Sequence, residues 1–258
     1  MDSYVDQNRG LDVTYEDYEP GYGSPTGIAR TTEFTLWALP ATPSSERLAQ
    51  MAHNLATPAR LMPEPAALQA AGLFGDWAPV DRSTPAGAAI EDQNDFLLNF
   101  YRDQVEQRRW YGFWSYGDWM HTYDRDRHVW RYDIGGFAWA NSELSPDLWL
   151  WYSYLRSGDA AIFRLAEAMT RHTGEVDCYH IGPWKGLGTR HGVQHWADSS
   201  KQPRVSTAAY RRIYYYLTAD ERTGDLLREA LEGDVALTRV DIGRKVSARP
   251  GGVIAAGT

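Results

Sequence analysis

Two helix–turn–helix segments of the same plan constrain the fold of this chain most strongly. The first begins at Ser145-Pro146, where an N-cap residue precedes a proline suited to the first helical position. Its helices are predicted over residues 147–156 and from the turn at 157–159 to about residue 172. The second segment is predicted over residues 206–231, with its turn at 218–220. Short turns make the two helices of each segment antiparallel neighbours.

The two segments also share sequence. Residues 152–155 align with residues 214–217, and residues 165–169 align with residues 227–231. Internal repetition of a helix pair is typical of stacked helix-pair architectures. Further helices are predicted at about 44–57, 66–71 and 90–109, the last with a stripe of Phe96, Leu97, Phe100 and Tyr101. The fold class predicted from these patterns is therefore mainly α, a stack of antiparallel helix pairs with long loops on one face.

Two long links separate these helices, over residues 110–143 and 173–204. If successive pairs stack side by side, both links emerge on the same face of the molecule. Five of the seven histidines lie in the links, namely His121, His128, His180, His191 and His195. Polar, aromatic and titratable groups gathered on one face of a rigid scaffold predict a functional site there.

Composition narrows the classes of ligand. The formal net charge of −8 argues against nucleic acid and against an anionic membrane surface as partners. No apolar run is long enough for a transmembrane helix. Eleven Trp and sixteen Tyr outnumber seven Phe, and flat rings with a polar handle suit saccharides. The polar N-terminus is unlike a signal peptide, so a complete chain would be cytoplasmic, whereas a fragment of a longer protein could be secreted or cell-surface.

Several catalytic motifs are missing. The sequence contains no P-loop, no G-x-G-x-x-G and no G-x-S-x-G nucleophile elbow. His191 and His195 are four residues apart, but the H-E-x-x-H pattern of zinc proteases is absent, so no metal site and no cofactor are predicted. Calcium held by Asp124 or Asp126 is the alternative that stays open. The single cysteine, Cys178, excludes an internal disulfide.

Four segments carry a resemblance to a known family. Residues 114–124 (WSYGDWMHTYD), 130–143 (WRYDIGGFAWANSE), 188–198 (GTRHGVQHWAD) and 212–225 (RIYYYLTADERTGD) resemble the catalytic toroid of exo-acting rhamnogalacturonan lyases, polysaccharide lyase family 26. The resemblance implies an (α/α)₆ toroid accompanied by β-rich domains. Here only three or four helix pairs and no β-rich domain are recognisable. A partial toroid over residues 28–232 is therefore predicted, between irregular segments at 1–27 and 233–258, with flanking domains of the same protein as missing partners.

The resemblance also implies a reaction, β-elimination at a galacturonate in an acidic polysaccharide. The substrate carboxylate must be neutralised, a base must take the C5 proton, and an acid must protonate the leaving oxygen. The candidate catalytic residues are His191 or His195 as base, Tyr132, Tyr116 or the other histidine as acid, and Arg190 on the carboxylate. The candidate substrate-binding residues are Lys185, Arg131, Trp184, Trp196, Trp119, Tyr116, His121, Tyr179, His180, Asp118 and Asp133.

Two other functions remain open from the sequence. A glycoside hydrolase on a helical toroid would use a pair of carboxylates, and Asp118, Asp133 and Asp198 lie in or beside the links. A non-catalytic saccharide-binding fragment would need the aromatic residues but not the histidines. An incomplete toroid would also expose apolar helix faces.

Overall fold

The computed structural model describes residues 25–113, 115–121, 123–130, 139–140, 145–189, 203 and 207–239. Its helices are α2 (Ser45–Ala56), α3 (Pro65–Ala70), α4 (Pro85–Arg108), α5 (Pro146–Ser157), α6 (Ala160–Glu175), α7 (Ala208–Thr218), α8 (Glu221–Leu231) and α9 (Gly233–Leu237). Two short antiparallel strands, β1 (Tyr123–Asp124) and β2 (Val129–Trp130), form a hairpin. The predicted mainly α-helical fold class is confirmed.

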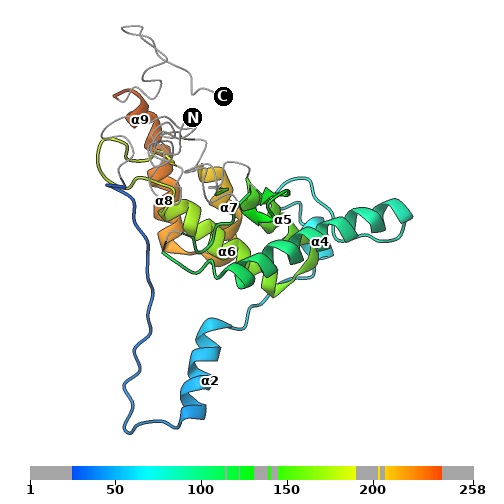
Figure 1. The fold of residues 1–258 in the computed structure, drawn as a ribbon, viewed down its shortest axis with the longest axis horizontal. Coiled ribbons are helices and arrows are strands. Elements are labelled where there is room, and N and C mark those ends of the chain that lie inside the picture. The colour runs from blue at the N-terminus through cyan, green and yellow to red at the C-terminus, as the bar shows by residue number, and fades with distance from the viewer. Residues whose placement is uncertain are drawn as a thin grey trace.

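The two predicted helix pairs form as expected, α5 with α6 and α7 with α8 (Figure 1). In both turns an aspartate begins the second helix, because its carboxylate accepts a backbone N–H of the first turn. Asp159 accepts from Ala161 at 2.7 Å, and Asp220 accepts from Thr223 at 2.6 Å. The start of α5 differs from expectation. Ser145 has a left-handed backbone, and its hydroxyl donates to the Tyr210 hydroxyl instead of capping the helix.

The core lies where the two pairs meet. Trp151 of α5 is fully buried, and its indole N–H donates to the Thr170 hydroxyl of α6 at 2.8 Å. Its ring centroid is 5.5 Å from that of Tyr214 on α7. Leu150 and Ile213, also fully buried, belong to the same cluster. One large aromatic side chain therefore contacts three helices and fixes the pairs against each other.

Helix α4 is longer than predicted. It begins at Pro85 because the Thr84 side chain accepts the Gly87 N–H and Pro occupies the first helical position. Only part of its predicted apolar stripe is covered. The Tyr101 ring stacks on the Trp119 ring with centroids 4.2 Å apart, whereas Phe96 is 61% exposed.

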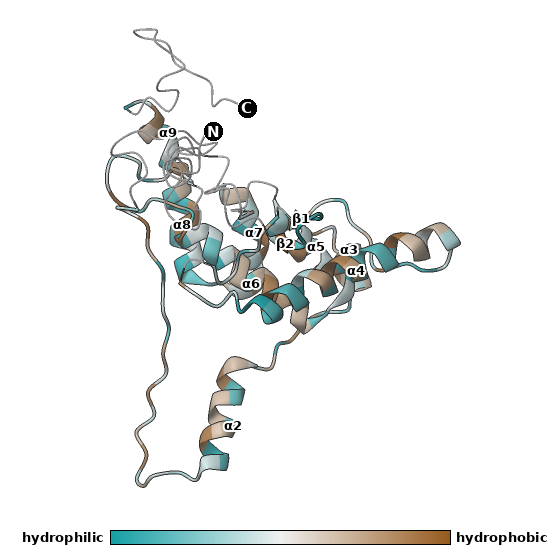
Figure 2. Cartoon of the chain, in the orientation of Figure 1, coloured by the Kyte–Doolittle hydropathy of each residue, from teal (hydrophilic) through white to brown (hydrophobic). Residues whose placement is uncertain are grey.

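The N-terminal arm, residues 29–56, differs from this body. Residues 29–39 form no regular element, and α2 contains no buried residue. Phe34 and Leu36 are each 88% exposed. Figures 1 and 2 show the arm leaving the helical body with hydrophobic residues along it. Apolar side chains are therefore exposed along this arm.

Two further features bear on the sequence predictions. The short helix α9 stands at the start of the tail that was expected to be irregular. Within the described ranges, no helix is long and apolar enough to cross a membrane.

Candidate functional site

The two long links meet at the C-terminal end of α6. Asp118 belongs to the first link and Asp177 to the second, and both face His172 in the last turn of α6. The Nε2 atom of His172 lies 3.6 Å from an Asp118 carboxylate oxygen and 3.5 Å from one of Asp177. All three side chains are fully buried. The described parts of the two links therefore meet at one end of α6.

This cluster holds charge inside the protein. Burial lowers the pKa of His172, but Asp177 and Asp118 outweigh burial, so the pKa lies above its usual value. The Nδ1 atom of His172 is 3.0 Å from the Tyr116 carbonyl oxygen, to which a protonated ring donates. A doubly protonated imidazolium therefore donates to the carbonyl oxygen and places its positive charge beside the two carboxylates. The three potential ligand atoms lie within 4.8 Å of one another, a spacing that a metal ion could also bridge.

Two buried groups of opposite charge type, Asp147 and Arg211, lie at the beginnings of α5 and α7. Arg211 is buried and donates to the carbonyl oxygens of Thr173, at 2.7 Å, and Thr207, at 3.3 Å. Burial raises the pKa of Asp147 to about 7, although Arg211 opposes the shift. The Oδ2 atom of Asp147 has no hydrogen-bond partner among the described residues. Perturbed carboxyls of this kind are enriched at functional sites.

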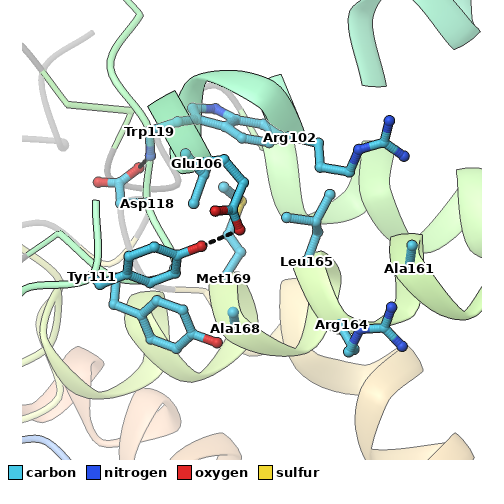
Figure 3. Close-up of a pocket in the computed structure, with 13 residues that line it drawn as sticks. Arg102, Glu106, Tyr111, Asp118, Trp119, Ala161, Arg164, Leu165, Ala168 and Met169 are labelled. Atoms are coloured by element: carbon cyan, nitrogen blue, oxygen red, sulfur yellow. Dashed lines mark hydrogen bonds between the residues drawn. The ribbon is translucent and has the colours of Figure 1, made fainter. Parts of the chain in front are cut away.

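A cavity of about 250 Å³ opens beside this cluster, between α4, the first link and α6 (Figure 3). Arg102 and Glu106 reach it from α4, Tyr111 and Tyr116 from the link, and Arg164 from α6. The Tyr111 hydroxyl donates to the Glu106 carboxylate, which raises the pKa of Tyr111 to about 12. This tyrosine therefore stays protonated at neutral pH.

A second hollow, of about 490 Å³, lies between the N-terminal arm and the flank of α6. It shares Tyr116, Arg164 and Ala168 with the first cavity. The two hollows are therefore neighbours along α6, with Arg164 at their common boundary.

The predicted residues of the first link are divided between core and cavity. Tyr116 is 40% exposed and lines both hollows. Asp118 is buried against His172, and its Oδ1 atom accepts the Trp119 N–H at 2.7 Å. Trp119 is only 5% exposed and packs between Tyr101 and Trp149. His121 is half-buried. Of these residues, Tyr116 is the one placed for direct ligand contact.

The described part of the second link is held by structural contacts. Tyr179 is fully buried, and the half-buried Trp184 packs on it with ring centroids 5.3 Å apart. His180 Nδ1 lies 2.5 Å from the Glu229 carboxylate on α8, and its Nε2 lies 2.9 Å from the Glu175 carbonyl oxygen. Lys185 forms an exposed ion pair with Glu232 at 2.7 Å. These four predicted binding residues anchor the link to its neighbours.

Several predicted residues lie outside the described ranges, namely Arg131, Tyr132, Asp133, Arg190, His191, His195, Trp196 and Asp198. Their roles stay predictions.

Asp124 and Asp126, the residues of the open calcium alternative, lie at the β-hairpin. Asp124 accepts the backbone N–H groups of Asp126 and Arg127, both at 3.0 Å, and so closes the turn between β1 and β2.

Sequence reasoning missed His172, Asp177, Asp147 and Arg211. Each lies within two or three residues of a helix end that borders a predicted link. Their position could have indicated a functional role, because all four are polar or charged residues at helix ends next to the links. The sequence pattern does not single these residues out, because they lie inside or beside apolar helical stretches.

Comparison with known proteins agrees with this architecture. Residues 58–256 match the sequence model of the PcRGLX-like protein C-terminal alpha/alpha toroid domain. The chain therefore belongs to the PcRGLX-like family. Residues 1–53 match the model of the central beta sandwich domain of the same proteins, a relation that the polar composition of the N-terminal segment did not reveal. The exposed arm thus falls largely in a segment related to a β-sandwich.

A curated member of similar sequence is the uncharacterized protein YetA of Bacillus subtilis (strain 168). It is 49% identical over 234 residues, which make up 91% of this chain. The same alignment covers 27% of YetA, so the chain spans about a quarter of its relative.

Proposed function

We propose that this PcRGLX-like chain acts on rhamnogalacturonan-type acidic polysaccharide by β-elimination, as a polysaccharide lyase. Family membership supports the substrate class. The geometry supports α6 as the location of the substrate site, because both links converge there beside an open cavity lined by arginine and tyrosine side chains.

The convergence of the links on His172 is the observation that carries the proposal. Thr189, which is fully buried, donates its backbone N–H to the Asp177 carbonyl oxygen at 2.9 Å. Arg190 and His191 follow Thr189 directly in the chain. The proposal assigns the substrate carboxylate to Arg190, through bidentate pairing, and C5 proton abstraction to His191 or His195. Tyr132 or the other histidine then protonates the departing C4 oxygen.

Elimination is preferred to hydrolysis because of the state of Asp118. A hydrolase needs two carboxylates that face the glycosidic bond. Asp118 is 2% exposed and lies against His172, so its carboxylate is engaged inside the protein. One of the three carboxylates available to a hydrolase is therefore committed to holding the two links together.

The test uses the chain with rhamnogalacturonan oligosaccharides as substrate. A lyase forms a conjugated unsaturated uronate, so ultraviolet absorbance rises as reducing ends appear. We expect this rise, and we expect Arg190→Ala and His191→Ala to abolish it while the far-ultraviolet circular dichroism is unchanged. Reducing ends without an absorbance gain would identify a hydrolase. Oligosaccharide binding with no product of either kind would identify a non-catalytic binding protein, and either result overturns the proposal.

A further inference from the structure

We propose that the two hollows along α6 form one groove that binds a uronate-containing oligosaccharide, with Arg164 pairing to a sugar carboxylate and Tyr116 contacting a sugar ring. The class of ligand rests on the proposed function, whereas the groove itself rests on contacts within the described residues.

The hollows have the dimensions of an oligosaccharide site. The first is about 250 Å³ and the second about 490 Å³, and both are lined by Tyr116, Arg164 and Ala168. Pockets of several hundred Å³ accommodate small organic ligands. Because the two share residues, a ligand longer than one sugar can extend from the α4 side of α6 to the side of the N-terminal arm.

Arg164 differs from the arginines around it. In the second hollow, Arg60 pairs with Glu167 at 2.9 Å, and Arg171 pairs with Glu33 at 2.8 Å. Arg30 donates to two backbone carbonyl oxygens of the first link, each at 3.1 Å. Within the part of the chain that the structure describes, the Arg164 guanidinium pairs with no carboxylate. It is exposed at the boundary of the two hollows.

The carboxylates that line the groove are already engaged. Glu106 accepts the Tyr111 hydroxyl. Glu167 accepts the Tyr214 hydroxyl at 2.9 Å as well as pairing with Arg60. Acidic side chains that have such partners repel an incoming anion less than free ones do. The two hollows are lined by as many carboxylates as arginines, so an incoming anion is attracted mainly where a guanidinium lacks a carboxylate partner, as at Arg164.

A second cation, Arg102, also lines the first cavity. Arg102 reaches the cavity from α4, and its nearest ion-pair contact is the exposed neighbour Asp103 at 3.6 Å. Figure 3 shows the Arg102 and Arg164 guanidinium groups at the same end of the cavity, with Ala161 near them. Two guanidinium groups at one end suit a carboxylate, because each offers a planar fork of donors.

The aromatic lining favours a sugar acid over a simple anion. Tyr111 and Tyr116 are 46% and 40% exposed, with ring centroids 5.9 Å apart. Tyrosine offers an apolar face to the C–H face of a sugar and a hydroxyl to its rim. Inorganic phosphate or sulfate would use the arginines but not these rings.

The experiment measures the affinity of trigalacturonate by isothermal titration calorimetry. Arg164→Gln should weaken binding about tenfold, the loss expected for one charge-assisted pair. The matched control is Arg228→Gln on α8, which removes the same charge from an exposed residue that lines neither hollow. Arg228→Gln should leave the affinity within about twofold, since exposed charges outside a site act only through screened interactions. Arg164→Lys, which keeps the charge, should retain intermediate affinity.

Two further ligands identify what the groove recognises. Fully methyl-esterified trigalacturonate has the same rings without the charge, so Arg164→Gln should not change its affinity. Inorganic phosphate should compete only weakly with trigalacturonate. Equal trigalacturonate affinity in the two glutamine variants would overturn the proposal, as would equal losses for the charged and esterified ligands. Strong competition by phosphate would show an anion site in place of a saccharide groove.

The outcomes also separate this inference from the proposed function. If trigalacturonate binding depends on Arg164 but rhamnogalacturonan gives no unsaturated product, the groove proposal holds and the lyase proposal is wrong. If unsaturated product forms but Arg164→Gln does not change trigalacturonate affinity, the lyase proposal holds and the groove proposal is wrong.

Discussion

The two long links have opposite relations to the rest of the molecule. In the first, Tyr111 and Tyr116 remain exposed and face a cavity. In the second, the stretch from Cys178 to Thr189 closes on itself. Tyr179 donates its N–H to Leu187 at 3.0 Å, and Gly186 donates back to Tyr179 at 2.8 Å. Similar residue types therefore line a cavity beside α4 and α6 in the first link, whereas in the described part of the second link they pack against one another and against α8.

Removing the histidine that joins the links should have the largest effect. His172→Ala leaves Asp118 and Asp177 buried without their shared cation. Breaking a buried ionic cluster in this way costs about 3–5 kcal/mol of unfolding free energy. Urea denaturation measures the loss, and His53→Ala on the exposed helix α2 is the control. A loss no larger than that of the control would show that the links are held together by other contacts.

The same variant predicts a pH dependence. The pKa of His172 lies above its usual 6.5 in the folded state, so its stabilisation is complete below pH 6.5 and is lost as pH rises through the folded pKa. The difference in unfolding free energy between the wild type and His172→Ala should therefore shrink above pH 6.5. The raised pKa of Asp147 gives its own decline of stability up to about pH 7, but this contribution largely cancels in the difference. A difference that grows with pH would contradict the assignment.

A pair of glycine substitutions compares the links directly. Gly117, in the first link, has a φ of +93°, and an added Cβ would lie 2.2 Å from the Ala168 carbonyl oxygen. Gly182, in the second link, has a φ of +86° but nothing within 4 Å of an added Cβ. Gly182→Ala should cost about 1–2 kcal/mol from backbone strain alone. Gly117→Ala adds overpacking against α6 and should cost about 2–4 kcal/mol. Equal losses would show that the first link does not press on α6.

A smaller loss is expected from the anchor of the second link. His180→Ala removes the hydrogen bond to Glu229 and the contact with the Glu175 carbonyl oxygen. The expected cost is about 1–3 kcal/mol of unfolding free energy, because the bond involves a charged partner. Affinity for trigalacturonate should stay at the wild-type value in the folded protein. A large loss of affinity without loss of stability would show that His180 contacts the ligand.

The smallest effect is expected at Lys185. Its ion pair with Glu232 is exposed on both sides, and such pairs contribute little. Lys185→Ala should leave the melting temperature and the trigalacturonate affinity unchanged, as measured by differential scanning fluorimetry and calorimetry. A clear drop in affinity would place a ligand on the second link.

The sequence predicted the helix pairs well because their signals are local. The turns at Gly158 and Ala219, with the capping aspartates that follow, depend on neighbouring residues and do not require knowledge of the fold. The exposed arm was harder to interpret. Alternation of Thr32, Phe34 and Leu36 suggests a strand, yet among the described residues no strand is paired with this segment. The match of residues 1–53 to a β-sandwich accounts for the pattern, since strands form only when they are paired.

The candidate site was predictable in position but not in detail. The sequence indicated that the two links share one face, and their described parts do meet at His172. Which link residues face a cavity depends on side-chain packing between distant segments, such as Trp119 on Tyr101. His172 and Arg164 belong to a helix whose pattern looks structural, and only the folded chain brings them to the links.

Hydrogen–deuterium exchange with and without rhamnogalacturonan oligosaccharide tests the contrast between the links most directly. We predict slower exchange on binding across residues 102–119 and 161–172, which line the cavity and support it. Residues 178–189 should exchange at the same rate with and without ligand, because structural contacts already hold them. Protection confined to residues 178–189, with none across the first link and α6, would contradict the account.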